Sequence, residues 1–365
     1  MGELACIDLF CGAGGLTQGL IQEGVDVVAG IDVDAACKHP FEANNSAKFI
    51  QGDVAEVPAE QIRDLFGTAK TRILAGCAPC QPFSTYSQRY ETVGTPRWGL
   101  LYHFARLVKT AEPELVTMEN VPSVMKHDVY KDFVSTLKNL GYHVWSNVVD
   151  CTEYGLPQRR RRTVLLASRS GPIELISPTH EKAVTVRQAI GDMPALDQGG
   201  TCGSDTLHTA AKLSDLNLER IRVSKPGGTW RDWPSHLVAE CHRRDSGRTY
   251  PGVYGRMDWD EPSPTLTTQF YGFGNGRFGH PEQDRAISLR EGAIIQGFPA
   301  SYSFVPDGAP IHFKTLGRLI GNAVPVTLGR IIGKSISAHL GTSSAGQTSI
   351  NMDGMADAED NPLVA

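Results

Sequence analysis

The stretch Leu-Ala-Cys-Ile-Asp-Leu-Phe-Cys-Gly-Ala-Gly-Gly, residues 4–15, joins an apolar segment to a run of glycines. The apolar half, Leu4 to Phe10, predicts a buried strand, and the residues after the glycines predict a helix that ends at Gly24. A glycine-rich turn between a strand and a helix lets the backbone approach a nucleotide closely, as in Rossmann-type folds. The dinucleotide fingerprint G-x-G-x-x-G would need glycine at Thr17, so an NAD-dependent dehydrogenase is not favoured.

Two carboxylates follow at the ends of the next predicted strands. Val27 to Ile31 forms the second strand and leads into Asp32, and Phe49 to Gln51 forms the third and leads into Asp53. A carboxylate at such a strand end can accept hydrogen bonds from ribose hydroxyls. The glycine loop and the two carboxylates together predict a site for an adenosine-containing cofactor other than NAD.

A second stretch, Gly-Cys-Ala-Pro-Cys-Gln-Pro-Phe-Ser at residues 76–84, follows the predicted strand Arg72–Ala75. A cysteine in a loop at the rim of a sheet is well placed for a nucleophile. Cys77 and Cys80 also form a C-x-x-C pair, which is typical of redox proteins. No second pair with zinc-ligand spacing exists in the sequence. Spacing alone therefore leaves three roles open for Cys77 and Cys80, namely a nucleophile, a redox pair or inert packing residues.

Polar residues lie beside two further predicted strands. Leu115–Met118 leads into Glu119 on the same side as Cys80, where a carboxyl group could donate a proton to a heterocycle; a solvated or capping carboxylate is the alternative. Four arginines, residues 159–162, precede the strand Thr163–Ala167. Strand alternation puts Arg160 and Arg162 on one face, although a solvated basic surface would give the same pattern.

The charge is unevenly distributed along the 365 residues, whose net charge is −5. Residues 158–256 contain 16 Lys and Arg against 10 Asp and Glu, which gives +6 and leaves −11 for the rest. Such a basic segment suits a polyanion, although an uneven surface explains it as well. The eight scattered cysteines fit a reducing cytoplasm, and neither a signal peptide nor an apolar run long enough to span a membrane is present.

The chain resembles the cytosine-5 DNA methyltransferase family. The strings DLFCGAGG, GDV, GCAPCQPFS, MENV and GLPQRRRRTVLLAS occur in the family's order, and Arg256, Pro264-Thr265, RAISLREGAIIQGFP at 285–299 and Gly321-Asn322-Ala323-Val324-Pro325 continue the pattern. The resemblance covers roughly residues 4–340, apart from a variable block near 170–250. Members of this kind act in bacterial restriction–modification systems or as orphan enzymes.

The resemblance implies an α/β fold, namely a Rossmann-like, S-adenosylmethionine-dependent methyltransferase sheet with a smaller, mixed target recognition domain. We expect a catalytic and cofactor-binding domain at 1–168, a target recognition domain at about 169–255, a return to the catalytic domain at 256–340 and a disordered tail at 341–365. In the family, the C-terminal helix folds back beside the first strand and completes the cofactor site. The block's arginines and aromatics, among them Trp230, Trp233, Tyr250 and Tyr254, fit either DNA contact or a small core.

The resemblance also implies roles for single residues. Cys80 is expected to be the nucleophile, Glu119 to bind the cytosine ring, and Arg160 and Arg162 to steady its carbonyl and lower the thiol pKa, which leaves Cys77 to packing. The residues expected to bind S-adenosylmethionine are Phe10, Gly12, Gly14, Gly15, Asp32, Val33, Asp53, Val54, Pro79, Leu100, Asn322 and Ala323. The residues expected to bind DNA are Gln81, Ser84, Ser87, Arg243, Arg244, Arg248 and Thr265. Residues 85–99 are expected to clamp the DNA, and no metal is expected.

The predicted function is methyl transfer from S-adenosylmethionine to carbon 5 of a flipped-out cytosine in a specific duplex sequence, through a Cys80 adduct. An RNA (tRNA) methyltransferase would share this chemistry, and a DNA-binding regulator could keep the fold without activity. The sizeable block favours duplex DNA, and the presence of Cys80, Glu119 and the arginines disfavours the regulator. We expect a bacterial cytoplasmic protein that is monomeric and associates with the nucleoid through DNA. Any cognate restriction endonuclease is expected to act without direct contact to it. The sequence does not identify the recognised DNA word.

Overall fold

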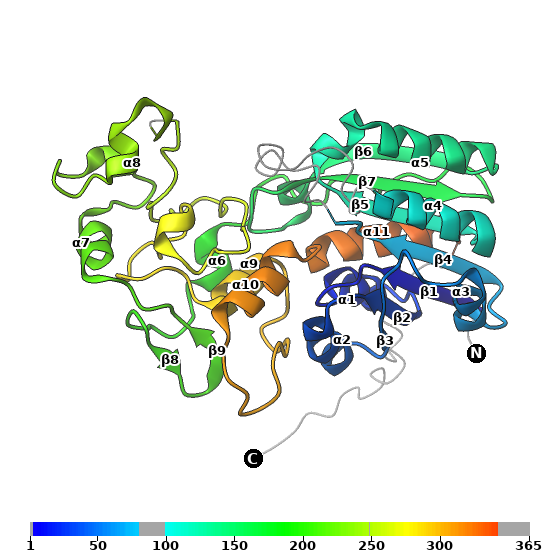
Figure 1. The fold of residues 1–365 in the computed structure, drawn as a ribbon, viewed down its shortest axis with the longest axis horizontal. Coiled ribbons are helices and arrows are strands. Elements are labelled where there is room, and N and C mark those ends of the chain that lie inside the picture. Colours follow the sequence, from blue (N-terminus) through cyan, green and yellow to red (C-terminus); the bar gives the residue numbers. More distant parts are fainter. Residues whose placement is uncertain (1–2, 80–98, 248, 342–365) are drawn as a thin grey trace, which may run out of the picture.

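A computed structural model describes residues 3–79, 99–247 and 249–341 of the protein. Seven strands form one sheet in the order β3-β2-β1-β4-β5-β7-β6 (Figure 1). The strands are β1 Leu4–Leu9, β2 Val27–Asp32, β3 Lys48–Gln51, β4 Thr71–Gly76, β5 Leu115–Asn120, β6 His143–Asp150 and β7 Arg161–Ser168.

The first five strands pair in parallel, whereas β7 runs antiparallel to both β5 and β6. The connections reverse direction between β1 and β4, and the carboxyl ends of strands beside such a switch point are where open α/β sheets bind ligands. Since β7 is reversed, its amino end lies at this same edge. The predicted Rossmann-like sheet is confirmed.

Helices cover both faces of the sheet, so the central strands are apolar nearly throughout. On one face, α1 Gly15–Gln22 and α11 Val326–His339 share a core, and η6 Cys151–Tyr154 packs against it. On the other face lie α3 Ala59–Phe66, α4 Leu100–Ala111 and α5 Asp128–Asn139. The short helix α2 Lys38–Asn44 packs beside β3.

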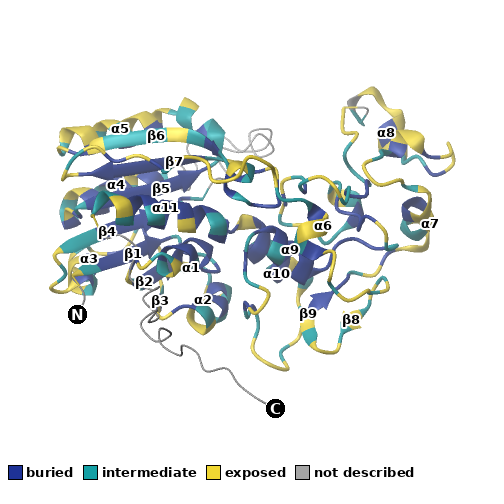
Figure 2. Cartoon of the chain, turned by 180° about the vertical axis from the view of Figure 1, so that it is seen from behind, coloured by how far each residue is buried: buried dark blue, intermediate teal, exposed yellow. Residues whose placement is uncertain are grey.

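The residues after β7 form a second group of elements beside the sheet (Figures 1 and 2). These elements are α6 Val186–Ile190, β8 Thr201–Cys202, β9 Asp205–Thr209, α7 Asp215–Val223, α8 Glu240–Arg243, α9 Leu289–Ile295 and α10 Phe313–Asn322. A small separate core within this group contains Trp230, Trp233 and Phe273. Within the described ranges, no helix is both long and apolar enough to cross a membrane.

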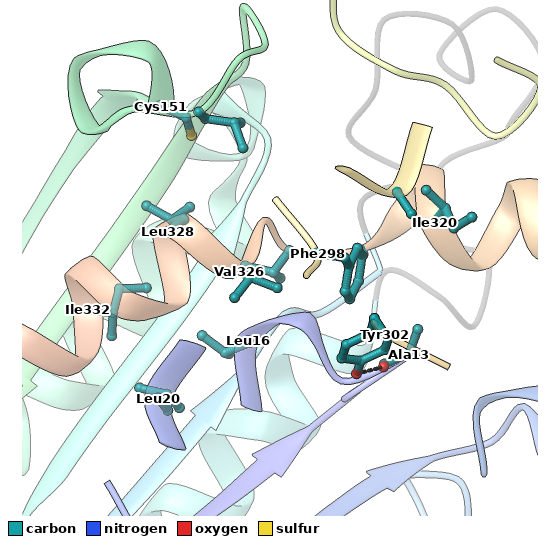
Figure 3. Close-up of a cluster of buried hydrophobic side chains, with 14 of the residues drawn as sticks. Ala13, Leu16, Leu20, Cys151, Phe298, Tyr302, Ile320, Val326, Leu328 and Ile332 are labelled. Atoms are coloured by element: carbon teal, nitrogen blue, oxygen red, sulfur yellow. Dashed lines mark hydrogen bonds between the residues drawn. The ribbon is translucent and has the colours of Figure 1, made fainter. Parts of the chain in front are cut away.

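The C-terminal helix α11 packs directly on α1, the helix that follows β1 (Figure 3). Leu16 and Leu20 of α1 share one buried cluster with Val326, Leu328 and Ile332 of α11, and Leu328 lies on the side of α11 toward Cys151, away from α1. The backbones approach closely because α1 carries glycine at the crossing. A Cβ added to Gly19 would lie 2.4 Å from the carbonyl oxygen of Val326.

We therefore expect Gly19→Ala to destabilise the protein, because the added methyl group meets backbone atoms of α11 that cannot move aside. Overpacking of this kind costs about 1–3 kcal/mol. The measurement is the free energy of unfolding in urea. Gly203→Ala is the matched control, since its added Cβ has no atom within 4 Å. Equal stability of the two variants would contradict this account of the crossing.

Candidate active site

Glu119 is a buried acidic group at the ligand-binding edge of the sheet. Its side chain is 3% exposed, and Nε of Arg162 lies 2.8 Å from its Oε1. The Arg162 side chain is itself only 12% exposed, so water screens this ion pair little. Arg162 reaches Glu119 because antiparallel β7 lies next to β5, with Asn120 opposite Thr163.

The second carboxylate oxygen of Glu119 is bound by the Cys77 thiol. Sγ of Cys77 donates a hydrogen bond to Oε2 at 2.8 Å. Because Gly76 pairs with Met118, Cys77, the residue after β4, lies beside Glu119 of β5. Cys77 packs against the core, as expected, and its half-buried thiol also binds the carboxylate oxygen of Glu119 that Arg162 does not contact.

The two inner arginines have different partners. Arg160 is buried, and its guanidinium donates to the carbonyl oxygens of Gly321 at 3.4 Å and Ala323 at 3.3 Å. It thereby ties the start of β7 to the turn between α10 and α11. Arg162 contacts Glu119 instead. The expected nucleophile Cys80 lies outside the described residues, and the described part of its loop ends at Pro79.

A cavity of about 880 Å³ opens beside this group. Its walls come from the loops after β1, β2, β3 and β4, from the start of α4 and from the turn between α10 and α11. Cys77 is also a lining residue, so the cavity extends to the thiol that holds Glu119. Its size is that of a site for an organic cofactor.

Asp32 is held rigidly at the rim of this cavity. The backbone N–H groups of Gly12 and Asp34 donate to its two carboxylate oxygens, each at 2.9 Å. Burial raises the pKa of Asp32, while these N–H donors oppose the shift. Each oxygen keeps a lone pair for a further donor, such as a ribose hydroxyl.

Ten of the twelve residues expected to bind the cofactor line the cavity, namely Phe10, Gly12, Asp32, Val33, Asp53, Val54, Pro79, Leu100, Asn322 and Ala323. Gly14 and Gly15 do not line it. A Cβ on Gly15 would lie 2.2 Å from the carbonyl oxygen of Val324, and Gly14 has a left-handed φ of 88°. These two glycines serve the turn and the close helix packing.

Sequence reasoning missed three charged residues of the cavity wall. Asp34 and Arg318 form an ion pair between the end of β2 and α10. Asp8, inside β1, is 1% exposed and accepts a hydrogen bond from the Thr17 hydroxyl at Oδ2, 2.7 Å away. Its Oδ1 has no hydrogen-bond partner. In the sequence, Asp8 lies within an apolar run that predicts a buried strand, so it resembled a core residue. Its position seven residues before Gly15 was the only sign of a role at the site.

Three of the residues expected to bind DNA are described by the structure, and none of these three lines the cofactor cavity. Thr265 is exposed, and its hydroxyl donates to the carbonyl oxygen of Arg159. Arg243 and Arg244 are exposed at the end of α8, where Arg243 donates to the carbonyl oxygen of Ser235 at 2.8 Å. The structure does not describe Gln81, Ser84, Ser87 and Arg248, nor residues 85–98 of the expected clamp.

The aromatic residues of the variable block could either contact DNA or form a small core, and they differ in burial. Trp230 and Trp233 are buried in the small core, and Tyr254 meets Trp233 edge-on at 5.8 Å between ring centroids. Tyr250, by contrast, is 47% exposed. Among the side chains that the structure describes, no group of three or more His, Cys, Asp and Glu could hold a metal ion.

The chain is similar to DNA methyltransferases in sequence and in fold. The family model described as C-5 cytosine-specific DNA methylase matches residues 4–338. Type II methylase M.HgiDII of Herpetosiphon aurantiacus is 52% identical over 327 residues, 88% of this chain and 92% of that protein. Type II methyltransferase M.Eco47II of Escherichia coli is 32% identical over 335 residues, 88% of this chain and 75% of that protein.

A solved structure shares the fold. A protein from an E. coli prophage, described as a DNA modification methyltransferase, superposes with a TM-score of 0.71 at 23% identity, covering 93% of this chain and 99% of its own. The sheet and the sequence matches define a DNA methyltransferase. The chain belongs to the C-5 cytosine-specific DNA methylase family, which methylates cytosine at carbon 5. The predicted family and enzyme class are confirmed, and neither the RNA methyltransferase nor the regulator is favoured.

Asp8 gives the folded protein a pH dependence that can be tested. Burial raises its pKa from 3.8 to about 7. The folded state therefore keeps this proton after the unfolded chain has lost it, so Asp8 lowers stability as the pH rises from 3.8 to about 7. We expect Asp8→Asn to be more stable than the wild type by about 4 kcal/mol at pH 8 and by much less at pH 5.

The measurement is chemical denaturation of both proteins at the two pH values. The difference between variant and wild type isolates Asp8 from the other titrating groups. Asparagine keeps an oxygen that can accept from Thr17. A stability difference that is the same at pH 5 and pH 8 would show that Asp8 is not a strained buried acid.

Proposed function

We propose that the protein methylates a cytosine flipped out of a specific short duplex sequence, through a covalent adduct with Cys80. The observation that carries this proposal is Glu119. It is held on both oxygens between the segment leading to Cys80 and the start of β7, next to the large cavity. A flipped base would meet these groups together, at an unstacking cost of a few kcal/mol.

Carbon 5 of cytosine is too weak a nucleophile to take a methyl group directly. The Cys80 thiol loses its proton and its sulfur adds to carbon 6, which moves the ring's 5,6 electron pair to carbon 5. Carbon 5 would then take the methyl group that the sulfonium of S-adenosylmethionine supplies, and the sulfur of that donor would keep the electron pair of the broken bond. Loss of the carbon-5 proton to solvent restores the 5,6 double bond and expels Cys80 as a thiolate, and uptake of a proton by this thiolate returns the enzyme to its starting state.

Glu119 would bind ring nitrogen 3 and the exocyclic amine, and would stabilise the charge that appears on addition. Arg162 and Cys77 fix the carboxylate before the base arrives, which avoids reorganisation during the reaction. Arg160 would act from the turn that it binds, whose residues Asn322 and Ala323 also line the cavity. These roles for Arg160 and Arg162 are proposals for this chain.

The family's chemistry implies S-adenosylmethionine, and the residues of the cavity fit it. Asp32 has lone pairs for ribose hydroxyls, and the partnerless Oδ1 of buried Asp8 suits a cationic group. When bound, this cofactor supplies the methyl group. Phe10, Val33 and Val54 would hold the adenosine, and Asp32 would orient its ribose.

We further propose that residues of about 169–255 read the DNA sequence, with Arg243 and Arg244 as candidates for DNA contact. They are exposed and lie away from the cofactor cavity. Base edges must be read by side chains outside the sheet, whose rim holds the cofactor and the flipped base. The names of the type II relatives support work within a restriction–modification system. We propose that the protein acts there as a monomer, without direct contact to a nuclease.

DNA that contains 5-fluorocytosine tests the covalent mechanism. Fluorine cannot leave carbon 5 as a proton does, so the wild-type protein should remain bound through Cys80 after denaturation. Cys80→Ala should abolish both this adduct and methyl transfer. Gel electrophoresis of denatured complexes is the readout.

Cys77→Ala is the matched control for that experiment. It should still form the adduct, but up to about tenfold more slowly, because Glu119 loses one hydrogen bond worth about 0.5–1.5 kcal/mol. Cys77→Ser, which keeps a donor, should restore much of the rate. Adduct formation that disappears with Cys77 and persists without Cys80 would reverse the assignment of the nucleophile.

The cofactor assignment predicts weaker binding when Asp32 is removed. Asp32→Ala should weaken S-adenosylmethionine binding about ten- to hundredfold, because hydrogen bonds to a charged group are lost. Isothermal titration calorimetry measures this without reliance on turnover. Asp64→Ala, on exposed α3, is the control, and unchanged affinity in Asp32→Ala would move the cofactor elsewhere.

A further inference from the structure

The four consecutive arginines divide into an inner and an outer pair. Arg160 and Arg162 are buried or nearly so, whereas Arg159 and Arg161 are exposed. The alternation is that of a strand whose successive side chains point to opposite sides. The inner pair binds the α10–α11 turn and Glu119. The mechanism above gives the outer pair no role.

The outer pair lines a concavity of about 670 Å³ that is separate from the cofactor cavity. Its walls come from the start of β7, the segment after β5, the β6–η6 junction and the loops around residues 183 and 261–265. Arg162 lines it as well. One wall of the concavity is therefore the residue that holds Glu119.

The charges around this concavity are not balanced. Glu261 is paired with Arg159, and Asp150 accepts hydrogen bonds at Oδ1 from the backbone N–H and the hydroxyl of Thr152. Across residues 3–79, 99–247 and 249–341, no ion pair or hydrogen bond engages the guanidinium of Arg161. Asp150 lies opposite Arg161 across β6 and β7, but the three arginines of the lining still outnumber its two carboxylates, and the unused guanidinium protons of Arg161 favour an anionic ligand.

The donors present indicate which anion fits. The hydroxyl protons of Thr152 and Thr265 are already donated within the protein, to Asp150 and to the Arg159 carbonyl. The guanidinium groups must therefore supply the donors, and their planar arrangement matches the oxygens of a phosphate. The residues that line the concavity are arginines, acids, threonines, prolines and Ala183, so its lining holds no aromatic ring on which a base could stack.

We propose that Arg159 and Arg161 bind a backbone phosphate of the DNA strand that carries the target cytosine. This inference rests on the proposed function, because a base that reaches Glu119 must bring its own strand past the amino end of β7. A phosphate held here would set the position of the strand relative to Glu119. It would carry no sequence information, because every nucleotide offers the same phosphate.

The experiment measures duplex binding by fluorescence anisotropy at several salt concentrations, with wild type, Arg161→Gln and Arg159→Gln. Two duplexes are used, one that the enzyme methylates and one with the same bases scrambled. Arg161→Gln should weaken binding to both duplexes by a similar factor, about tenfold or more. The slope of log affinity against log salt should fall by about 0.9 for the lost phosphate contact. Arg159→Gln should act in the same direction but less, because its charge is already shared with Glu261.

Arg63→Gln is the control for a general loss of positive charge. This exposed arginine of α3 donates to the Thr110 carbonyl at the far end of α4 from the cofactor cavity, and its replacement should leave the salt slope unchanged. Wild-type affinity and slope in Arg161→Gln would overturn the proposal. A loss confined to the methylated duplex would also overturn it, since Arg161 would then read bases.

The proposal can fail separately from the proposed function. Adduct formation by the wild-type protein with 5-fluorocytosine DNA at saturating concentration tests Cys80 without reference to the salt slopes. If the wild type forms no adduct, the mechanism fails while the salt slopes still report on the phosphate contact. If the adduct forms and the slopes are equal, only the phosphate site fails.

Discussion

The close crossing of α1 and α11 is the constraint on which the site depends. Because Gly15 and Gly19 carry no side chain, the start of α11 can lie against the backbone of α1. This contact carries the turn before α11 to the cofactor cavity, where Asn322, Ala323 and Val324 form part of the wall. A segment more than 300 residues from the glycine loop thereby completes the same cavity.

The same turn connects the cavity to the reaction centre. Its carbonyl oxygens accept from Arg160, and the next inner arginine along β7 holds Glu119. Cys77 provides a second connection, because it binds Glu119 and also lines the cavity. Cofactor wall, arginines and carboxylate therefore form one connected polar structure. Burying these charges is tolerable only because each has found a partner of opposite charge or a carbonyl oxygen.

Local patterns in the sequence were sufficient for the elements and for much of the cavity. The apolar runs predicted β1, β2, β4 and β5, and the positions of Asp32 and Asp53 after strands placed both at one edge. Local patterns could not predict contacts between segments that are remote in the sequence. The Cys77–Glu119 bond and the Asp34–Arg318 pair depend on how strands and helices pack, and neither partner signals the other. Close packing and cofactor contact both call for glycine at positions 14 and 15, so the sequence alone does not separate these two uses.

The four arginines raise a question of strand alignment that the rest of β7 answers. If β7 slipped by one residue against β5 so that Arg159 and Arg161 took the inner positions, an arginine would still occupy each of them. The apolar residues that follow are buried on both faces, so neither run resists this shift. Buried polar residues that precede the arginines and follow the apolar residues do resist the shift. Gln158 bonds Gln296 and the backbone of Leu266, and Ser168 bonds His339. A slip would break these bonds in the interior, so two uncharged side chains decide which arginines reach Glu119 and the α10–α11 turn.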